Sequence, residues 1–193
     1  MPYVPTITTM IRLDHTHVVA AFHRYGSETA WWRKRAIVSS VCRALEIHAQ
    51  LEEEIFYPAL ARIAPTDETL KKSRPEHDKL REVIAKLRGT GPENAAYDSL
   101  FMELMRDTLH HIADEETRLL PLAERALGPE LRTLGAEMTR RRVQLLGEHP
   151  VEVAVSTAGT FPVATALLMA LFACGVARLA GGNRWRRGPT RTV

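Results

Sequence analysis

The segment HAQLEEEIFYP, residues 48–58, has a counterpart later in the chain in HIADEETRLLP, residues 111–121. In both segments a His is followed by a Glu four residues later and by a Pro ten residues later. Residues four apart lie on the same face of an α-helix, so each His and Glu point to one side. The spacing therefore predicts two helices that each present a His–Glu pair.

A second motif precedes each of these segments. Asp14-His15 lies 33 residues before His48, and Glu76-His77 lies 34 residues before His111. An acidic-His dipeptide followed by an H-x-x-x-E helix thus occurs twice, with an offset of 62–63 residues. This internal repeat predicts a duplicated pair of helices.

The rest of the chain agrees with an all-α fold. Helical periodicity covers residues 9–25, 28–62, 69–88, 94–127 and 129–146, and short links with Gly or Pro separate these segments. We expect an up-down antiparallel four-helix bundle over residues 8–127, followed by an amphipathic connecting helix over 129–147. At 193 residues and 45% hydrophobic composition, the chain can bury such a core.

Composition excludes several classes of protein. Two distant cysteines without a C-x-x-C motif exclude a disulfide framework and a zinc ribbon. Eight Arg and only two Glu follow Thr139, which leaves 18 basic and 21 acidic residues in the preceding part. The net charge of +3 therefore comes from the tail, and we expect no nucleic-acid partner.

The tail, residues 150–193, has a different character. No charged residue occurs between Val153 and Ala177, and five Arg follow. This pattern predicts a C-terminal hydrophobic helix that enters a membrane and contacts lipid, with a helix docked on the bundle as the alternative. We expect the bundle at the cytoplasmic face of the cell membrane, with a soluble cytoplasmic protein as the second interpretation.

Helix geometry indicates where the repeated residues point. His48 and Glu52 occupy an apolar seam that also contains Val41, Leu45 and Ile55. The other three helices of the bundle have equivalent seams. Six ionisable side chains therefore converge on one core: His15, His48, Glu52, His77, His111 and Glu115.

Six such groups are costly to bury without a partner, and a metal removes that cost. Four imidazoles and two carboxylates are a mixed nitrogen and oxygen set that suits iron or manganese, and the set lacks the thiolates typical of structural zinc sites. Two carboxylates can bridge two metal ions and leave coordination positions open for a small ligand. We therefore predict these six residues as metal ligands.

Neighbouring polar residues are weaker candidates. His110 and Asp114 share a face with other polar residues, which indicates a solvated stripe. Glu53, Glu54 and Glu116 are expected at the surface or behind the ligands. Tyr57 follows His48 by nine residues. That separation is about 13 Å of helix rise, so we expect Tyr57 to pack away from the centre.

Together these segments resemble the hemerythrin-like, or HHE cation-binding, family. The resemblance covers residues 8–127 and rests on IRLDHTHVVAAFHRY, HAQLEEEIFYPAL, EHDKLREVIAKL and HHIADEETRLLPLAER. It implies a bundle around two non-haem iron ions, held by the same six residues. Oxygen-carrying members have a His where this chain has Arg81, so the set is closer to the bacterial di-iron branch.

The expected function follows from this centre. We expect a di-iron protein that binds, senses or reduces oxygen, nitric oxide or peroxide, with a redox partner that the sequence does not identify. Whether it is an enzyme stays open. The alternatives are a protein that stores or buffers iron without redox turnover, and an interaction bundle that has lost its metal.

Overall fold

The computed structural model describes residues 5–148, which form helices and short links without a strand. The helices in chain order are α1 (Ile7–Phe22), α2 (Trp31–Leu51), α3 (Tyr57–Ala61), α4 (Glu68–Gly89), α5 (Ala96–Asp114), α6 (Leu120–Ala126) and α7 (Leu131–Glu148). A π-helical turn, Glu52–Phe56, joins α2 to α3, and a second, Glu115–Leu119, joins α5 to α6. A short 3₁₀ turn, Gly128–Glu130, precedes α7.

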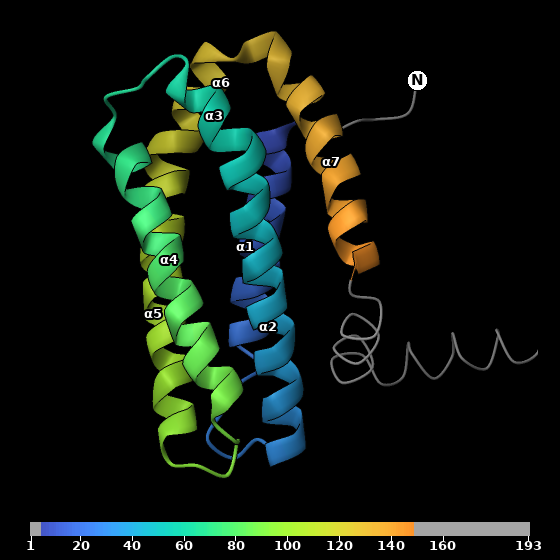
Figure 1. Ribbon diagram of the computed structural model, residues 1–193, viewed down its shortest axis with the longest axis vertical. Helices are drawn as coiled ribbons and strands as arrows, with labels where there is room; N and C mark the ends of the chain where they lie inside the picture. The colour runs from blue at the N-terminus through green and yellow to red at the C-terminus, as the bar shows by residue number, and fades with distance from the viewer. Residues whose placement is uncertain (1–4, 149–193) are drawn as a thin grey trace, which may run out of the picture.

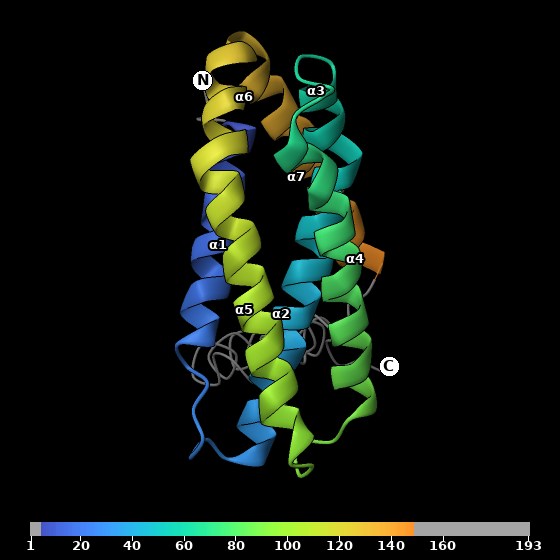
Figure 2. The same cartoon turned by 90° about the vertical axis from the view of Figure 1, so that its left-hand side faces the viewer.

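Four long rods form an up-down bundle (Figures 1 and 2). The rods are α1, α2 continued by α3, α4, and α5 continued by α6. Thr6 caps the start of α1 through the Thr9 amide at 3.2 Å, and Asp67 caps α4 through the Leu70 amide at 3.0 Å. These caps satisfy amides that the helices leave free at their N-termini. The predicted all-α bundle is therefore present.

The core consists of two apolar clusters with a polar layer between them. One cluster lies toward α3 and α6 and includes Ile11, Phe56 and Leu120. The other lies toward the opposite end and includes Phe22 and Phe101. The six predicted ligands lie between these clusters and are at most 5% exposed. The apolar clusters therefore position a layer of buried ionisable groups halfway along the bundle.

The two π turns begin at Glu52 and Glu115. In each, the backbone amide five residues later donates to the Glu carbonyl: Tyr57 to Glu52, and Leu120 to Glu115. Pro58 and Pro121 follow directly. Proline has no amide hydrogen, and its ring presses on the carbonyl four residues before it, so a wider turn relieves the clash. The trailing prolines of the repeat thus account for the widened turns.

Helix α7 packs outside the bundle, against α1 and α2 (Figure 1). Leu131, Met138 and Leu145 are buried at seven-residue spacing and form its inner stripe. Gly135 allows the close approach, because a Cβ atom there would lie 2.3 Å from the Pro5 carbonyl oxygen. Helix α7 is therefore docked on one side of the bundle.

The predicted membrane helix requires a correction. Among residues 5–148, no helix is both long enough and apolar enough to span a bilayer. The hydrophobic segment 150–193, on which that prediction falls, lies outside the described residues. Over the described residues, the fold class is corrected to an all-α bundle of four rods with one packed outer helix.

Candidate metal centre

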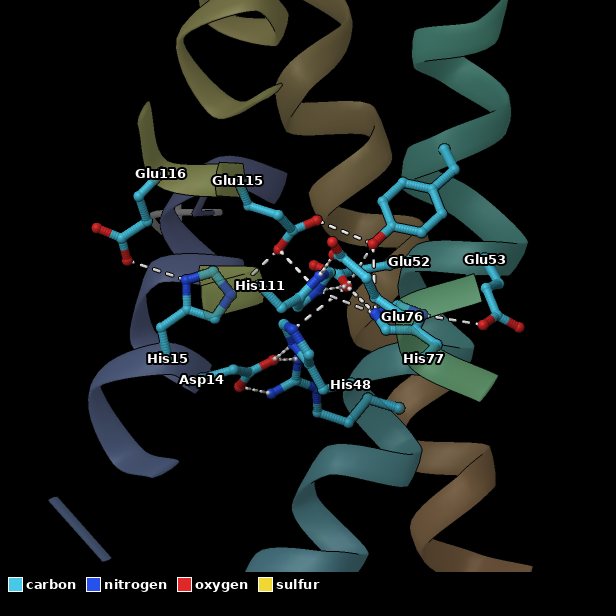
Figure 3. A network of polar contacts seen from close by, with 12 residues as sticks. Asp14, His15, His48, Glu52, Glu53, Glu76, His77, His111, Glu115 and Glu116 are labelled. Carbon is cyan, nitrogen blue, oxygen red and sulfur yellow. Dashed lines mark hydrogen bonds and ion pairs between the residues drawn. The ribbon is translucent and has the colours of Figure 1, made fainter. Parts of the chain in front are cut away.

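The structure brings all six predicted ligands together. His15 comes from α1, His48 from α2, His77 from α4 and His111 from α5, while Glu52 and Glu115 begin the two π turns. Figure 3 shows these side chains converging from separate helices. Their role as metal ligands stays a prediction, and their convergence is an observation.

Each carboxylate lies between imidazoles of the two repeats. Glu52 Oε2 lies 3.3 Å from His48 Nε2 and 3.4 Å from His77 Nε2. Glu115 Oε2 lies 3.3 Å from His15 Nε2 and 3.6 Å from His111 Nε2. Two groups of ligand atoms result, one of His15, His48, Glu52 and Glu115, and one of Glu52, His77 and His111. Glu52 belongs to both, as a bridging ligand would.

Several of these atoms have unmet bonding capacity. Within the described chain, His15 Nε2, His48 Nε2, Glu52 Oε1 and Glu115 Oε2 are buried without a hydrogen bond. His77 Nε2 and His111 Nε2 lie 3.0 Å apart, and two imidazole nitrogens at that distance require a proton or a cation between them. Buried polar atoms are almost always paired, so these residues fit a bound metal.

Each of the four predicted ligand histidines has an acidic partner on its other ring nitrogen. The Nδ1 atoms of His15, His77 and His111 each lie 2.9 Å from a carboxylate oxygen, and that of His48 lies 3.5 Å away. The partners, in the order His15, His48, His77 and His111, are Glu116, Asp14, Glu53 and Glu76. A carboxylate that accepts from Nδ1–H leaves the Nε2 lone pair free for a metal.

These acidic partners occur at equivalent positions of the internal repeat, so the sequence indicates them. The acidic residue of each dipeptide contacts the second histidine of its own repeat, as Asp14 does with His48. The Glu after each ligand Glu contacts the first histidine of the other repeat, as Glu53 does with His77. Glu54, by contrast, pairs with Arg141 at the surface, 2.6 Å away.

Buried carboxylates and imidazoles stabilise each other's charges. Burial opposes ionisation of Glu52, but His48, His111 and His77 outweigh it and hold the pKa of Glu52 well below its usual value. Burial also opposes a charged His111, yet Glu115, Glu52 and Glu76 raise the pKa of His111 to about 10. The carboxylates around His111 therefore favour a positive charge at this position, from a proton or from a cation.

Tyr57 corrects the sequence-based expectation. Its hydroxyl donates to Glu115 Oε1 at 2.9 Å and to Glu52 Oε2 at 3.2 Å, and it lies 3.3 Å from His77 Nε2. The π turn explains the error, because a five-residue turn places residue 57 over residue 52, whereas an α-helix would rotate it away. Axial rise from His48 was the wrong measure. Burial, Glu52 and Glu115 together raise the pKa of Tyr57 well above its usual value, so the hydroxyl stays protonated.

Two other sequence positions have different roles. Arg81, the residue four after His77, reaches Glu53 at 2.8 Å, and Glu53 in turn contacts His77. His110 is exposed and lies 3.8 Å from Asp114, which also contacts Lys72, so this pair belongs to the surface as expected.

Comparison with known proteins adds two findings. Residues 6–123 match the family model of the hemerythrin HHE cation binding domain. The fold is similar to the crystal structure of a hemerythrin HHE cation binding domain-containing protein from Mycobacterium kansasii, with a TM-score of 0.64 and 19% identity over 83% of this chain and 96% of that chain. At this identity the likeness concerns the fold. No curated protein matches the sequence.

Proposed function

Because the chain belongs to the hemerythrin HHE cation-binding domain family and its buried His and Glu groups could hold a metal, we propose a non-haem di-iron protein. Its centre would bind a small ligand such as oxygen, nitric oxide or peroxide, and sense or reduce it. Manganese is the alternative metal, because it accepts the same nitrogen and oxygen ligands.

One observation carries the proposal of two metal ions. The two groups of ligand atoms share Glu52, and Glu115 contacts histidines of both repeats. A single ion held by one of these groups would leave two of the four buried histidines without a metal ion at Nε2. Two ions bridged by the carboxylates would give the histidines of both groups a metal ion at Nε2.

The chain's own residues would hold this centre rigid. Glu116, Asp14, Glu53 and Glu76 orient the four imidazole rings from behind. The Tyr57 hydroxyl donates a hydrogen bond to Glu115 and lies within reach of the proposed metal positions, either as a hydrogen-bond donor or as a further ligand. When bound, two iron ions would supply electrons and an open coordination position for the small ligand.

Elemental analysis and optical spectroscopy test the proposal. We expect two iron ions per chain after expression in iron-replete cells, and new near-ultraviolet bands when the reduced protein meets oxygen or nitric oxide. Protein that contains iron but shows no spectral response would favour iron storage. Protein without stoichiometric metal would contradict the proposal.

A further inference from the structure

A cavity lies at the end of the bundle opposite α3 and α6, where the start of α2 meets the end of α4 (Figure 1). Its volume is about 270 Å³, room for roughly nine water molecules. One face of α2, the end of α4, the link over residues 90–93 and Tyr97 of α5 line it. None of the six predicted metal ligands belongs to this lining, so the cavity is separate from the centre.

The floor of the cavity is apolar. Val38, Cys42, Leu87 and Tyr97 are each at most 3% exposed and belong to the apolar cluster that includes Phe22 and Phe101. Burial raises the pKa of the Cys42 thiol to about 12, so this side chain stays neutral. The floor therefore favours the hydrocarbon part of a molecule over a bare charge.

Tyr97 adds one polar group to this floor. Its hydroxyl interacts electrostatically with Cys42 and Arg35, which both line the cavity, so the hydroxyl faces the cavity. The residue is 3% exposed, yet the hydroxyl forms no hydrogen bond with any group of residues 5–148. Tyr25 and Tyr57, by contrast, both donate to carboxylates. Because the hydroxyls of buried tyrosines are usually paired, a partner for Tyr97 is expected inside the cavity.

An aromatic ring and a cation stand together at the mouth. Trp31 and Arg35 lie one turn apart on α2, both are exposed, and both line the cavity. Arg88 also lines it, but Glu46 holds that guanidinium at 2.6 and 2.7 Å. Arg35 has no ion-pair partner among residues 5–148. Its planar fork is therefore available to a carboxylate, beside the flat apolar surface of Trp31.

The charges around the cavity favour one negative charge on a ligand. Glu93 is the acidic residue of the lining, and its carboxylate lies over Gly91, where a Cβ atom would be 2.1 Å from Glu93 Oε1. Glu46 contacts Arg43, 3.8 Å away, as well as Arg88. Together with Arg35, these residues are three Arg and two Glu, with a formal charge of +1. A second negative charge on the ligand would be repelled by Glu93.

We propose that this cavity binds a small aromatic monocarboxylate. Its carboxylate would accept hydrogen bonds from Arg35 and from the Tyr97 hydroxyl, and its ring would lie on the apolar floor beside Trp31. The volume limits such a ligand to about ten non-hydrogen atoms. The inference goes beyond the proposed function and does not depend on a bound metal.

Phenylacetate is a suitable probe, because it joins one ring to one carboxylate and has the right size. Isothermal titration calorimetry of the full-length protein compares it with phenylacetamide, which has the same shape without the charge, and with acetate, which lacks the ring. Phenylacetate should bind about tenfold more tightly than phenylacetamide, because charge-assisted hydrogen bonds are lost in the amide. Acetate should bind more weakly as well, because it buries no ring.

Two variants test the polar groups. Arg35→Gln changes an exposed residue, so the fold should persist, and it should weaken phenylacetate binding about tenfold while phenylacetamide binding is unchanged. Arg33→Gln is the matched control, because Arg33 is an exposed arginine of α2 outside the lining, and it should bind as wild type does. Tyr97→Phe should weaken phenylacetate binding about three- to tenfold.

A third variant tests the position of the site. Ser39 is an exposed residue of the lining, so Ser39→Phe should fill the cavity and weaken binding of both phenylacetate and phenylacetamide. Equal affinity of the wild-type protein for these two compounds, or no measurable binding of phenylacetate, would overturn the proposal. Unchanged phenylacetate binding in Arg35→Gln and Ser39→Phe would overturn it too. Metal content is measured separately, so failure of the di-iron proposal and failure of this inference are distinguishable.

Discussion

The two halves of the centre, residues 14–58 and 76–121, share every predicted ligand type but differ in the residues around them. Each half contributes an acidic-His dipeptide, a His–Glu pair, a second Glu and a Pro. Tyr57 precedes Pro58 in the first half, and Leu120 precedes Pro121 in the second. The duplication thus accounts for the predicted ligands of both halves. Single differences, such as Tyr57 against Leu120, make the surroundings of the two proposed metal ions chemically unequal.

The acidic partners differ as well. Asp14 is held by Arg142 of α7 at 2.7 and 2.5 Å, and its contact with His48 is long, at 3.5 Å. Its counterpart Glu76 contacts His111 at 2.9 Å, and Lys72 Nζ lies 3.7 Å from its other carboxylate oxygen. Because Arg142 competes for the Asp14 carboxylate, we expect His48 to be the less firmly oriented of the two histidines.

The largest effect should come from Glu52 and Glu115, because each carboxylate contacts histidines of both halves. Glu52→Ala and Glu115→Ala each remove a carboxylate that contacts histidines of both repeats, so each should lose most of the bound metal. Asp114→Ala, which removes a carboxylate of the surface, should retain it. Elemental analysis of the three variants measures this, and equal losses in all three would contradict the assignment of the centre.

Substitution of the acidic partners Glu76 and Asp14 should lower metal affinity by different amounts in the two halves. Glu76→Gln should lower metal affinity about 10- to 100-fold, the usual cost of changing a group that orients a ligand. Asp14→Asn should cost less, because Asp14 is shared with Arg142 and lies farther from its histidine. Competition with a chelator ranks the two affinities. The reverse order would contradict the comparison.

Tyr57→Phe removes one hydroxyl from one half. We expect metal affinity to fall by about tenfold, since charged hydrogen bonds contribute about 1.5–3 kcal/mol. Any visible absorption from a tyrosine–iron bond in the oxidised protein should disappear. Tyr97→Phe, in the apolar cluster that includes Phe22 and Phe101, is the matched control and should change neither property. Unchanged affinity and spectrum in Tyr57→Phe would show that the hydroxyl only packs.

The docking of α7 affects the first half, because α7 packs against α1 and α2. Gly135→Ala places a Cβ atom against the Pro5 carbonyl and should destabilise the fold by about 1–3 kcal/mol. Gly147→Ala in the same helix meets no atom within 4 Å and should be neutral or slightly stabilising. Denaturant unfolding measures both. Equal stability of the two variants would mean that α7 tolerates a shift at Gly135.

The smallest effect concerns the stability of the metal-free protein as pH changes. Neighbouring carboxylates raise the pKa of His111 to about 10, so its contribution is complete below its ordinary pKa of about 6.5 and disappears as pH rises toward 10. The lowered pKa of Glu52 has the opposite consequence, with stability lost as the medium becomes acidic. Melting temperatures should therefore peak between about pH 5 and 6.5. A melting temperature that keeps rising above pH 7 would contradict this.

Much of the fold was predictable from spacing in the chain. His48 and Glu52 replace apolar residues in a seam of period 3.6, and backbone geometry alone turns such positions inward. The repeat indicated which helices pair, and it placed all six predicted ligands in one layer. Boundaries were less accurate: α2 begins at Trp31, three residues after the predicted start, because the preceding residues form a turn in which the Thr29 amide donates to the Gly26 carbonyl at 3.1 Å.

Other features depended on contacts between distant parts of the chain. Tyr57 reaches the centre because a π turn rotates it over Glu52 and because Glu115 approaches from another rod. Asp14 and Arg142 meet across 128 residues only because α7 packs beside α1. Local sequence determined the periodicity of each helix and therefore its inward face. Only the tertiary structure decided which side chains from different helices meet, because that depends on how the packed rods are placed against one another.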